Sequence, residues 1–123
     1  MRMARDPQAI GPIIRGFAGA HFRLDGSTHA ALLLTPEQAI NWTPPPIEAL
    51  DEAALAPLLE IAPPIEFLLL GTGATTRLPT PALRAALEAR GIGIEAMDSR
   101  AAARAWAVLR GEERWIGGAF YPL

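Results

Sequence analysis

The residues best suited to chemistry form a loop near the middle of the chain. Three leucines at 68–70 lead directly into the sequence Gly-Thr-Gly at 71–73, and an arginine follows in the same loop. Glycines let the backbone turn sharply and leave N–H groups that can hold an anion. Asp98 follows the next apolar segment, and loops at the carboxyl ends of parallel strands gather at one edge of a sheet. The sequence therefore predicts a site for a small ligand or an anion, formed by Gly71, Thr72, Gly73, Arg77 and Asp98 and by free N–H groups at the helix start near Asp98.

A structural explanation of the same residues competes with this one. The glycines would then only turn the chain off a buried strand, Arg77 would be a solvated loop charge, and Asp98 would be a helix cap. A dinucleotide site is poorly supported, because its glycine pattern needs a third glycine at position 76, where this chain has threonine. Pro79 and Pro81 also delay the following helix, so its N–H groups come too late to hold a pyrophosphate.

Composition excludes several classes of chemistry. The chain has no cysteine, and all eleven of its basic residues are arginine, which rules out thiol nucleophiles, thiolate metal sites and lysine-based catalysis. Neither Ser27 nor Ser99 lies in a nucleophile elbow. We therefore expect no catalytic residue and no cofactor.

The charge and the apolar pattern also restrict the partners. The formal net charge is −2 and 20% of the residues are charged, as in an ordinary globular protein and unlike a protein that coats nucleic acid. No apolar run approaches the roughly 20 residues that span a bilayer, and the N-terminus shows no leader pattern. We expect a cytoplasmic protein with no direct membrane insertion and no nucleic-acid partner.

His21 and His29 flank a turn signal, Asp25-Gly26, and raise the question of a metal site. With a two-residue turn, Phe22 pairs with His29, so the two imidazoles point to opposite faces and cannot share an ion. A three-residue turn would restore a common face. No third ligand is evident in either case, so we expect no metal site.

Three aromatic residues, Trp106, Trp115 and Tyr121, are candidates for contact with a protein partner, because Trp, Tyr and Arg are enriched in binding hot spots. Core packing is the competing explanation. Trp106 is expected at a helix edge, and Trp115 at the start of a terminal strand that is exposed. Glycines at 117 and 118 indicate a bulge in that strand or the close approach of another backbone. An edge strand of this kind favours self-association, so a homo-oligomer is one outcome that we consider.

The first third of the chain predicts antiparallel strands. Extended segments at 13–17 and 22–24 precede Asp-Gly, which is typical of a type I′ hairpin. An apolar run at 30–34 and a short strand at 38–42 follow, and three prolines at 44–46 end the pattern. We interpret this part as an antiparallel meander.

The rest of the chain alternates strands and helices. Asp51 as N-cap would place Pro57 inside a helix, so we expect either a kink or a start nearer Leu55. The later elements are a strand at 65–70, a helix from the cap Thr80 to Gly91, a strand at 92–96, a helix from Asp98 or Ser99 to Gly111, and a strand from about 114 to 121. Short connections between them favour right-handed crossovers and parallel pairing.

The predicted fold class is therefore α/β. An N-terminal antiparallel hairpin or meander covers or extends a small β-α-β-α-β parallel unit, in three layers around a single core. We expect one domain over residues 1–123, with residues 1–11 as a flexible N-terminal arm.

Several segments together resemble a known family. They are the string Phe-Leu-Leu-Leu-Gly-Thr-Gly at 67–73, Leu78-Pro79, the helix with Leu83 and Leu87, Gly-Ile-Gly-Ile-Glu at 91–95, Met97-Asp98, Ala102-Ala103 and the hairpin at 22–26. The pattern is similar to a small domain shared with mitochondrial respiratory complex I assembly factors and with an adipogenesis-associated mammalian protein. The resemblance covers about residue 12 to the C-terminus.

This resemblance implies a non-enzymatic domain that works in assembly with a second assembly factor or a membrane-complex subunit. The chain departs from the family pattern at Ala74, where a basic residue is usual, and at Ala107, where Asn is often found. Both departures weaken the case for a charged ligand. Our first hypothesis is therefore a protein-interaction or assembly-factor-like domain. The alternative is a small-ligand or anion-binding protein, conceivably an enzyme, that uses the loop at 71–77 and Asp98.

Overall fold

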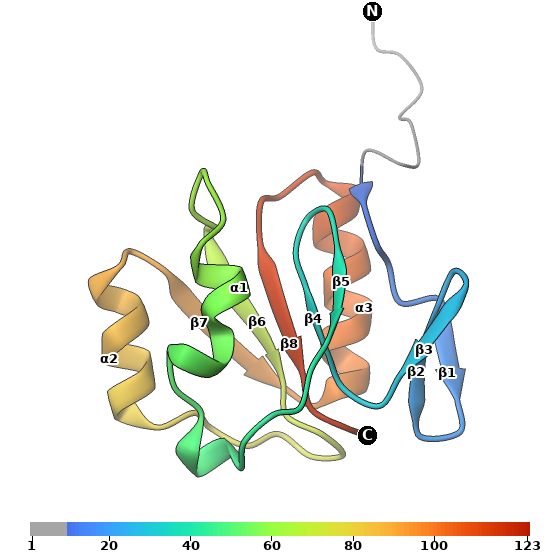
Figure 1. The fold of residues 1–123 in the computed structure, drawn as a ribbon, viewed down its shortest axis with the longest axis horizontal. Coiled ribbons are helices and arrows are strands. Elements are labelled where there is room, and N and C mark those ends of the chain that lie inside the picture. Colours follow the sequence, from blue (N-terminus) through green and yellow to red (C-terminus); the bar gives the residue numbers. More distant parts are fainter. Residues whose placement is uncertain (1–9) are drawn as a thin grey trace, which may run out of the picture.

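The structure is a computed structural model that describes residues 10–123 (Figure 1). The arm predicted over residues 1–11 lies outside the described residues, apart from its last two. The elements in chain order are β1 (Gly16–Ala18), β2 (His21–Leu24), β3 (Ser27–His29), β4 (Leu32–Leu34), β5 (Ala39–Asn41), η2 (Ile47–Ala49), η3 (Ala53–Leu55), α1 (Ala56–Leu59), β6 (Phe67–Gly71), α2 (Pro81–Ala89), β7 (Gly93–Met97), α3 (Ser99–Gly111) and β8 (Gly117–Phe120).

A five-stranded sheet with the order β5-β4-β8-β6-β7 forms the middle layer. Strand β6 pairs in parallel with β7 on one side and with β8 on the other. The two crossovers place α2 and α3 on opposite faces of the sheet (Figure 1), as right-handed connections that run in opposite directions across the sheet require. The predicted α/β class, its three layers and its β-α-β-α-β unit are confirmed.

The N-terminal strands both extend and cover this sheet. The hairpin around Asp25-Gly26 is confirmed, with Leu24 opposite Ser27. The predicted type I′ turn is wrong, because only Gly26 of the two turn residues has a positive φ (79°). The predicted antiparallel pairing is confirmed, although the strands are divided between two sheets: β1, β2 and β3 form a separate sheet while β4 and β5 join the larger one. Strand β3 is polar and largely exposed, whereas all three leucines of β4 are buried. An apolar run of that kind needs cover on both faces, so the chain leaves the small sheet at Ala30 and Ala31 and enters the middle layer.

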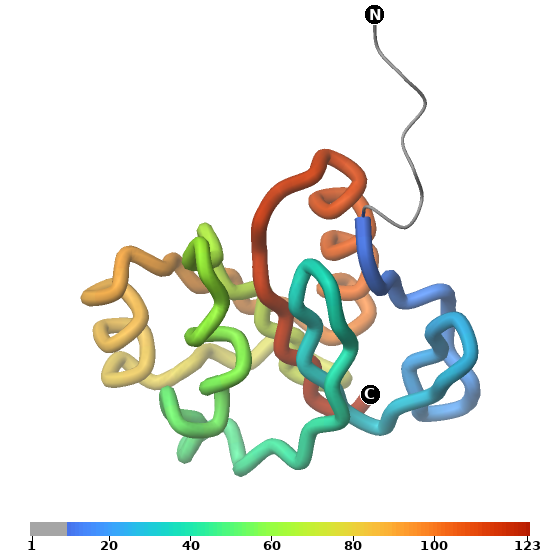
Figure 2. Tube along the Cα trace, turned by 45° about the horizontal axis from the view of Figure 1, so that its top comes forward, coloured from blue at the N-terminus to red at the C-terminus, as the bar shows by residue number. Residues whose placement is uncertain are grey.

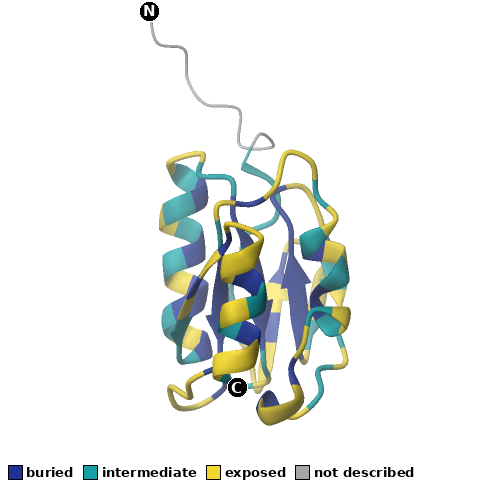
Figure 3. Ribbon diagram, turned by 90° about the vertical axis from the view of Figure 1, so that its left-hand side faces the viewer, coloured by how far each residue is buried: buried dark blue, intermediate teal, exposed yellow. Residues whose placement is uncertain are grey.

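Side chains alternate between the two faces of the large sheet and build a hydrophobic cluster on each. Leu68 and Leu70 face the cluster under α1 and α2. Leu69 faces the cluster under α3, which Phe22 and Leu24 of the small sheet also enter. Figure 3 shows the buried residues concentrated on the strands that lie between the helices. The hydrophobic core, which we expected to be single, is therefore divided into two clusters, one on each face of the sheet.

The helix boundaries follow the predicted caps. Thr80 accepts a hydrogen bond from the Leu83 N–H (3.1 Å), and Gly91 after α2 has a φ of 78°. Helix α1 begins at Ala56 with Pro57 in its first turn, which confirms the start near Leu55. Asp51 instead accepts a hydrogen bond from the Ala54 N–H (3.0 Å) in the preceding η3. In residues 10–123, no helix combines the length and the apolar character needed to cross a membrane.

The last strand is central, and the prediction of a terminal edge strand is wrong. Strand β8 lies between β4 and β6, so it offers no free edge to a second copy. Its glycines are required by neighbouring side chains rather than by another backbone. A Cβ at Gly117 would lie 2.8 Å from Ile65 Cδ1, and a Cβ at Gly118 would lie 2.7 Å from the Phe120 ring and 3.1 Å from the Trp106 ring.

We predict that Gly118→Ala lowers the free energy of unfolding by about 1–3 kcal/mol, because the added methyl group overpacks the cluster under α3. Gly93→Ala in β7 is the matched control, since its Cβ would meet Phe67 Cβ at an ordinary 3.5 Å. Urea denaturation of both variants measures the difference. Equal stability of the two variants would show that the ring contacts do not demand a glycine at 118.

Candidate functional site

The carboxyl ends of β6, β7 and β8 meet at one edge of the sheet, as predicted. The loop after β6, the start of α3 and the C-terminal residues lie together there, near the end marked C in Figure 2. Backbone hydrogen bonds join these segments directly. The Thr72 N–H donates to the Met97 carbonyl (2.9 Å), and the Tyr121 N–H donates to the Gly71 carbonyl (2.8 Å). The predicted residues are therefore brought close to one another.

Ser99 links all three segments, and the sequence interpretation missed this role. Its side chain is fully buried. Its Oγ accepts a hydrogen bond from the Gly73 N–H (2.8 Å) and donates one to the Tyr121 carbonyl (2.8 Å). Its N–H donates to the Gly73 carbonyl (2.8 Å). The serine hydroxyl thus occupies the place where a ligand oxygen would otherwise bind the loop.

Thr72 is also used within the chain. Its Oγ1 donates to the Thr75 carbonyl (2.6 Å) and accepts from the Arg77 N–H (2.9 Å). The residue is buried. These bonds close the loop on itself, so Thr72 shapes the turn and does not present its hydroxyl to a ligand.

The two glycines of the loop have steric roles. A Cβ at Gly71 would lie 2.9 Å from Ser99 Oγ and 3.1 Å from the Phe120 ring, so α3 can approach the sheet only at a residue without a side chain. Gly73 has a φ of 97°, a conformation that strongly favours glycine. Gly73 therefore turns the chain as the structural explanation holds, whereas Gly71 is needed for the close approach of α3 rather than for a turn.

Arg77 and Asp98 have separate partners. The Arg77 guanidinium forms an ion pair with Glu48 of η2. Both groups are largely exposed. A backbone hydrogen bond lowers the pKa of the Glu48 carboxyl most, and the hydrogen bond from Arg77 lowers it further. Asp98 caps α3 by accepting a hydrogen bond from the Ala101 N–H (2.9 Å).

Three of the N–H groups expected to be free at the start of α3 are used within the chain. Those of Ser99, Ala101 and Ala102 donate to the Gly73 carbonyl, the Asp98 carboxylate and the Asp98 carbonyl. This part of the anion-site prediction is wrong. The carboxylate also places a negative charge at the helix end that would have to attract an anion, so the site is poorly suited to phosphate.

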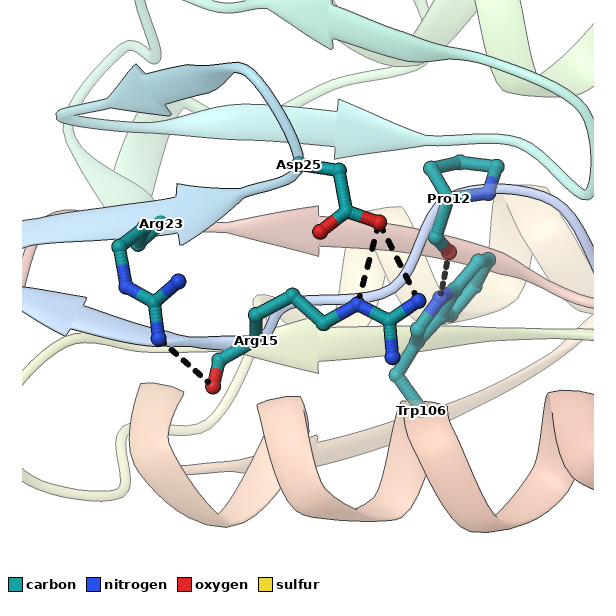
Figure 4. A network of polar contacts seen from close by, with 5 residues as sticks. All are labelled: Pro12, Arg15, Arg23, Asp25 and Trp106. Atoms are coloured by element: carbon teal, nitrogen blue, oxygen red, sulfur yellow. Dashed lines mark hydrogen bonds and ion pairs between the residues drawn. The ribbon is translucent and has the colours of Figure 1, made fainter.

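Trp106 does not face a partner, contrary to one of the two interpretations. Its exposed fraction is 0%, and its Nε1–H donates to the Pro12 carbonyl (2.9 Å), as Figure 4 shows. The core-packing explanation is confirmed for this residue, because its large ring fills the space between α3 and β8 above Gly118.

Trp115 and Tyr121 are half-buried, and their polar groups have partners in the chain. The Trp115 Nε1–H donates to the Pro63 carbonyl (2.7 Å). The Tyr121 hydroxyl donates to the Pro45 carbonyl (2.8 Å), and its ring meets Trp42 edge to face at 5.2 Å. Both residues tie the C-terminal segment to the proline-rich connections.

The histidine register is confirmed, since Phe22 pairs with His29 across a two-residue turn. The His29 ring bonds to the Ser27 hydroxyl and to the Asn41 side-chain oxygen, whereas His21 is exposed on the opposite face of β2. Across the part of the chain that the structure describes, no three His, Asp or Glu side chains are grouped to hold a metal ion.

A second surface, absent from the sequence interpretation, combines the N-terminal hairpin with α3. We call it the arginine face and define it as Arg15, Arg23, Arg100 and Arg104. Arg15 pairs with Asp25 (3.2 Å), and Arg23 donates to the Arg15 carbonyl (3.3 Å), as Figure 4 shows. The Arg100 guanidinium lies 4.4 Å from the centre of the Phe17 ring.

An apolar hollow of about 190 Å³ lies within the arginine face, between β1 and α3. Its lining residues are Ile14, Arg15, Gly16, Phe17, Ala103, Arg104 and Ala107. The signal that the sequence did contain is the spacing of Arg100 and Arg104, which are four residues apart on one helix with no acidic residue three or four positions away from either.

These features define a three-layer α/β domain whose glycine-bearing loop locks the helix of one outer layer to the sheet. The chain belongs to the family described as proteins of unknown function, DUF498/DUF598, whose model matches residues 14–121. An uncharacterised protein of Rhodobacter capsulatus is 35% identical over 121 residues, which cover 97% of this chain and 92% of that protein.

Solved structures support the same assignment. A crystal structure of a Bordetella parapertussis protein is 28% identical, with a TM-score of 0.80, and the match covers 95% of this chain and 100% of that one. An NMR structure of a Xanthomonas campestris protein is 30% identical, with a TM-score of 0.76, over 98% and 91% of the two chains. The family and the fold are established by these comparisons, whereas the link to complex I assembly is a matter for proposal.

We predict that Ser99→Ala lowers the free energy of unfolding by about 1–3 kcal/mol, because the buried Gly73 N–H and Tyr121 carbonyl lose their shared partner. Ser27→Ala, at an exposed hydroxyl, is the control and should change stability by less than about 0.5 kcal/mol. Chemical denaturation measures both. A Ser99→Ala variant as stable as the control would show that this link is not needed.

A second prediction concerns Tyr121, the only tyrosine in the chain. Burial raises the pKa of its phenol to about 12, and the nearby Glu48 carboxylate adds to the rise while Arg77 opposes it. The pKa in the unfolded chain is about 10. Stability from the neutral phenol is therefore complete below pH 10 and is lost as the pH rises towards 12.

Absorbance at the tyrosinate band measures this directly, with circular dichroism as the check that the chain stays folded. We expect a titration midpoint near pH 12 in the native protein and near pH 10 in denaturant. A native midpoint near pH 10 would contradict the buried, hydrogen-bonded phenol.

Proposed function

We propose that this domain acts by binding another protein. The observation that carries the proposal is the exposed face of α3, where Arg100 and Arg104 lie one turn apart and Val108, 62% exposed, lies a further turn along. Arginine and apolar side chains together are typical of the surfaces on which proteins associate.

The two arginines on this face destabilise the isolated helix. Two arginines at positions i and i+4 repel each other by a few tenths of a kcal/mol. Arg100 also lies in the first turn of α3, where the helix dipole disfavours a cation. Local rules of this kind are broken most often where function requires it, and a partner that brings carboxylates to the face would relieve the repulsion.

The resemblance to complex I assembly factors supports the same class of function. Its implied partner is a second assembly factor or a subunit of a membrane complex, met in the cytoplasm by a domain that does not itself enter the bilayer. The Gly71-Arg77 loop fits this proposal as a structural element, because the Thr72 hydroxyl and the N–H groups of Gly73 and Arg77 bond within the chain.

The alternative function, binding of a small ligand or anion at the loop with Asp98, makes a different prediction. Phosphate or nucleotide would raise the melting temperature, and Asp98→Asn would change that rise. Asparagine caps a helix about as well as aspartate, so this variant removes the charge and keeps the cap.

The test is purification of the tagged full chain from its native host after mild cross-linking, followed by native mass spectrometry. We expect a protein partner in a fixed ratio. Val108→Asp should reduce its recovery at least about tenfold, since a charge would then be buried at the contact. Ala89→Asp, at an exposed position of α2, is the matched control and should keep the partner.

Two results would overturn the proposal. One is a chain that purifies without any protein in a fixed ratio. The other is strong thermal stabilisation by phosphate or nucleotide that Asp98→Asn abolishes, which would favour the ligand-binding function instead.

A further inference from the structure

We infer that the arginine face holds a short acidic segment of the partner protein, with one apolar side chain of that segment seated in the hollow between β1 and α3. The inference rests on the proposed function and adds the place and the chemistry of the contact.

The hollow has the size and lining for one side chain. Its volume is about 190 Å³, below the roughly 300–1,000 Å³ of most small-molecule pockets. Ile14, Phe17, Ala103 and Ala107 give it an apolar lining. Gly16 contributes only backbone to the lining, and a Cβ there would meet Arg23 Nη2 at 2.8 Å. A leucine or an aromatic ring from a partner would find apolar contacts there.

The cations around the hollow are available to bind carboxylates. Among the residues that the structure describes, Arg23, Arg100 and Arg104 form no ion pair, whereas Arg77, Arg90 and Arg114 each pair with a glutamate. A guanidinium binds a carboxylate through two parallel N–H groups. The guanidinium groups of Arg23, Arg100 and Arg104 are therefore open to a carboxylate of a partner, whereas most of the arginines outside the face already bind a carboxylate of this chain.

One of these arginines is held in position before any partner arrives. The Arg100 guanidinium stacks on Phe17, 4.4 Å from the ring centre, and Phe17 itself lines the hollow. Cation–π contact of this kind is worth about 0.5–1 kcal/mol at an exposed site. The contact restricts the Arg100 side chain in advance, so less conformational entropy is lost on binding. It also joins a charged group of the arginine face to the apolar lining of the hollow.

A protein segment fits these features better than a nucleic acid or a membrane surface. Phosphate-rich partners need a broad basic footprint, while this chain carries a net charge of −2 and Asp25 lies within the face, paired with Arg15. A phosphate array also has nothing to fill an apolar hollow. A segment with alternating acidic and apolar residues matches both parts.

The larger groove elsewhere on the molecule does not compete. It measures about 330 Å³ and lies between α2 and the segment of η2 and η3. Its carboxylates already have partners, since Glu48 pairs with Arg77, Glu52 pairs with Arg90, and Asp51 accepts the Ala54 N–H. None of the carboxylates named here needs a ligand to balance its charge or its hydrogen bonds.

The test is an NMR titration of the ¹⁵N-labelled full chain with short synthetic peptides. The first peptide carries a central leucine flanked by aspartates and glutamates. In the second, asparagine and glutamine replace the acids, and in the third, serine replaces the leucine. We expect the first to shift the amides of Gly16, Phe17, Ala103 and Ala107, and the other two to bind at least about tenfold more weakly.

Paired variants locate the contact. Arg100→Glu with Arg104→Glu should weaken binding of the acidic peptide at least about tenfold. Arg84→Glu with Arg90→Glu changes the net charge equally but lies on and after α2, so it should leave binding nearly unchanged. Binding of the acidic peptide should also weaken as salt is raised.

Each other outcome overturns the inference. It is wrong if none of the peptides binds, or if the shifts are confined to residues outside the arginine face. It is also wrong if the two double variants have equal effects. Tighter binding to vesicles of anionic lipid or to RNA than to peptide, or concentration-dependent dimerisation that buries the same residues, would assign the face to another occupant.

The inference and the proposed function fail in different ways. If the native partner stays bound to the Arg100→Glu, Arg104→Glu chain, the protein-binding function stands and the arginine face is not its site. If no native partner is found at all, the proposed function itself fails.

Discussion

The contact between Gly71 and Ser99 fixes the position of α3 on the sheet. Helix α3 begins against the end of β6 because Gly71 has no side chain, and the Ser99 hydroxyl then bonds to Gly73 and Tyr121. A bulkier residue at 71 would push the helix away and leave buried polar groups without partners. The same contact sets the rotation of α3, so it directs Trp106 into the core and leaves Arg100 and Arg104 exposed.

The sequence predicted those parts of the fold that local interactions decide. Asp25-Gly26 specifies its hairpin, and Thr80 and Gly91 mark the ends of α2, because turn and cap geometry depend on a few neighbouring residues. The place of β8 in the sheet depends on pairing with β4 and β6, which are far apart in the chain. Its glycines suggested a weak edge strand, although their neighbours are Ile65 and Trp106, and nothing local in the sequence reveals such contacts.

The candidate site shows the same division between local and distant information. The sequence correctly placed the loop at 71–73 and Asp98 at one edge of the sheet, since parallel topology requires it. Whether an N–H or hydroxyl is free depends on its partner, and here Ser99 and Thr72 use several of these groups within the chain. The arginine face could not be assembled from sequence, because its two halves come from opposite ends of the chain. Only the Arg100 and Arg104 spacing was visible.

The charge of the whole molecule determines how such a face would work. With a net charge of −2, the chain exerts little long-range attraction on an acidic partner, and charges more than about 8 Å apart are screened at physiological salt. Electrostatic steering would therefore contribute little to the rate of association. Selection of the partner would depend on short-range fit, with paired N–H groups of arginine for carboxylates and the hollow for one apolar side chain. A face of this design discriminates by slow dissociation of the correct segment rather than by fast capture of any anion.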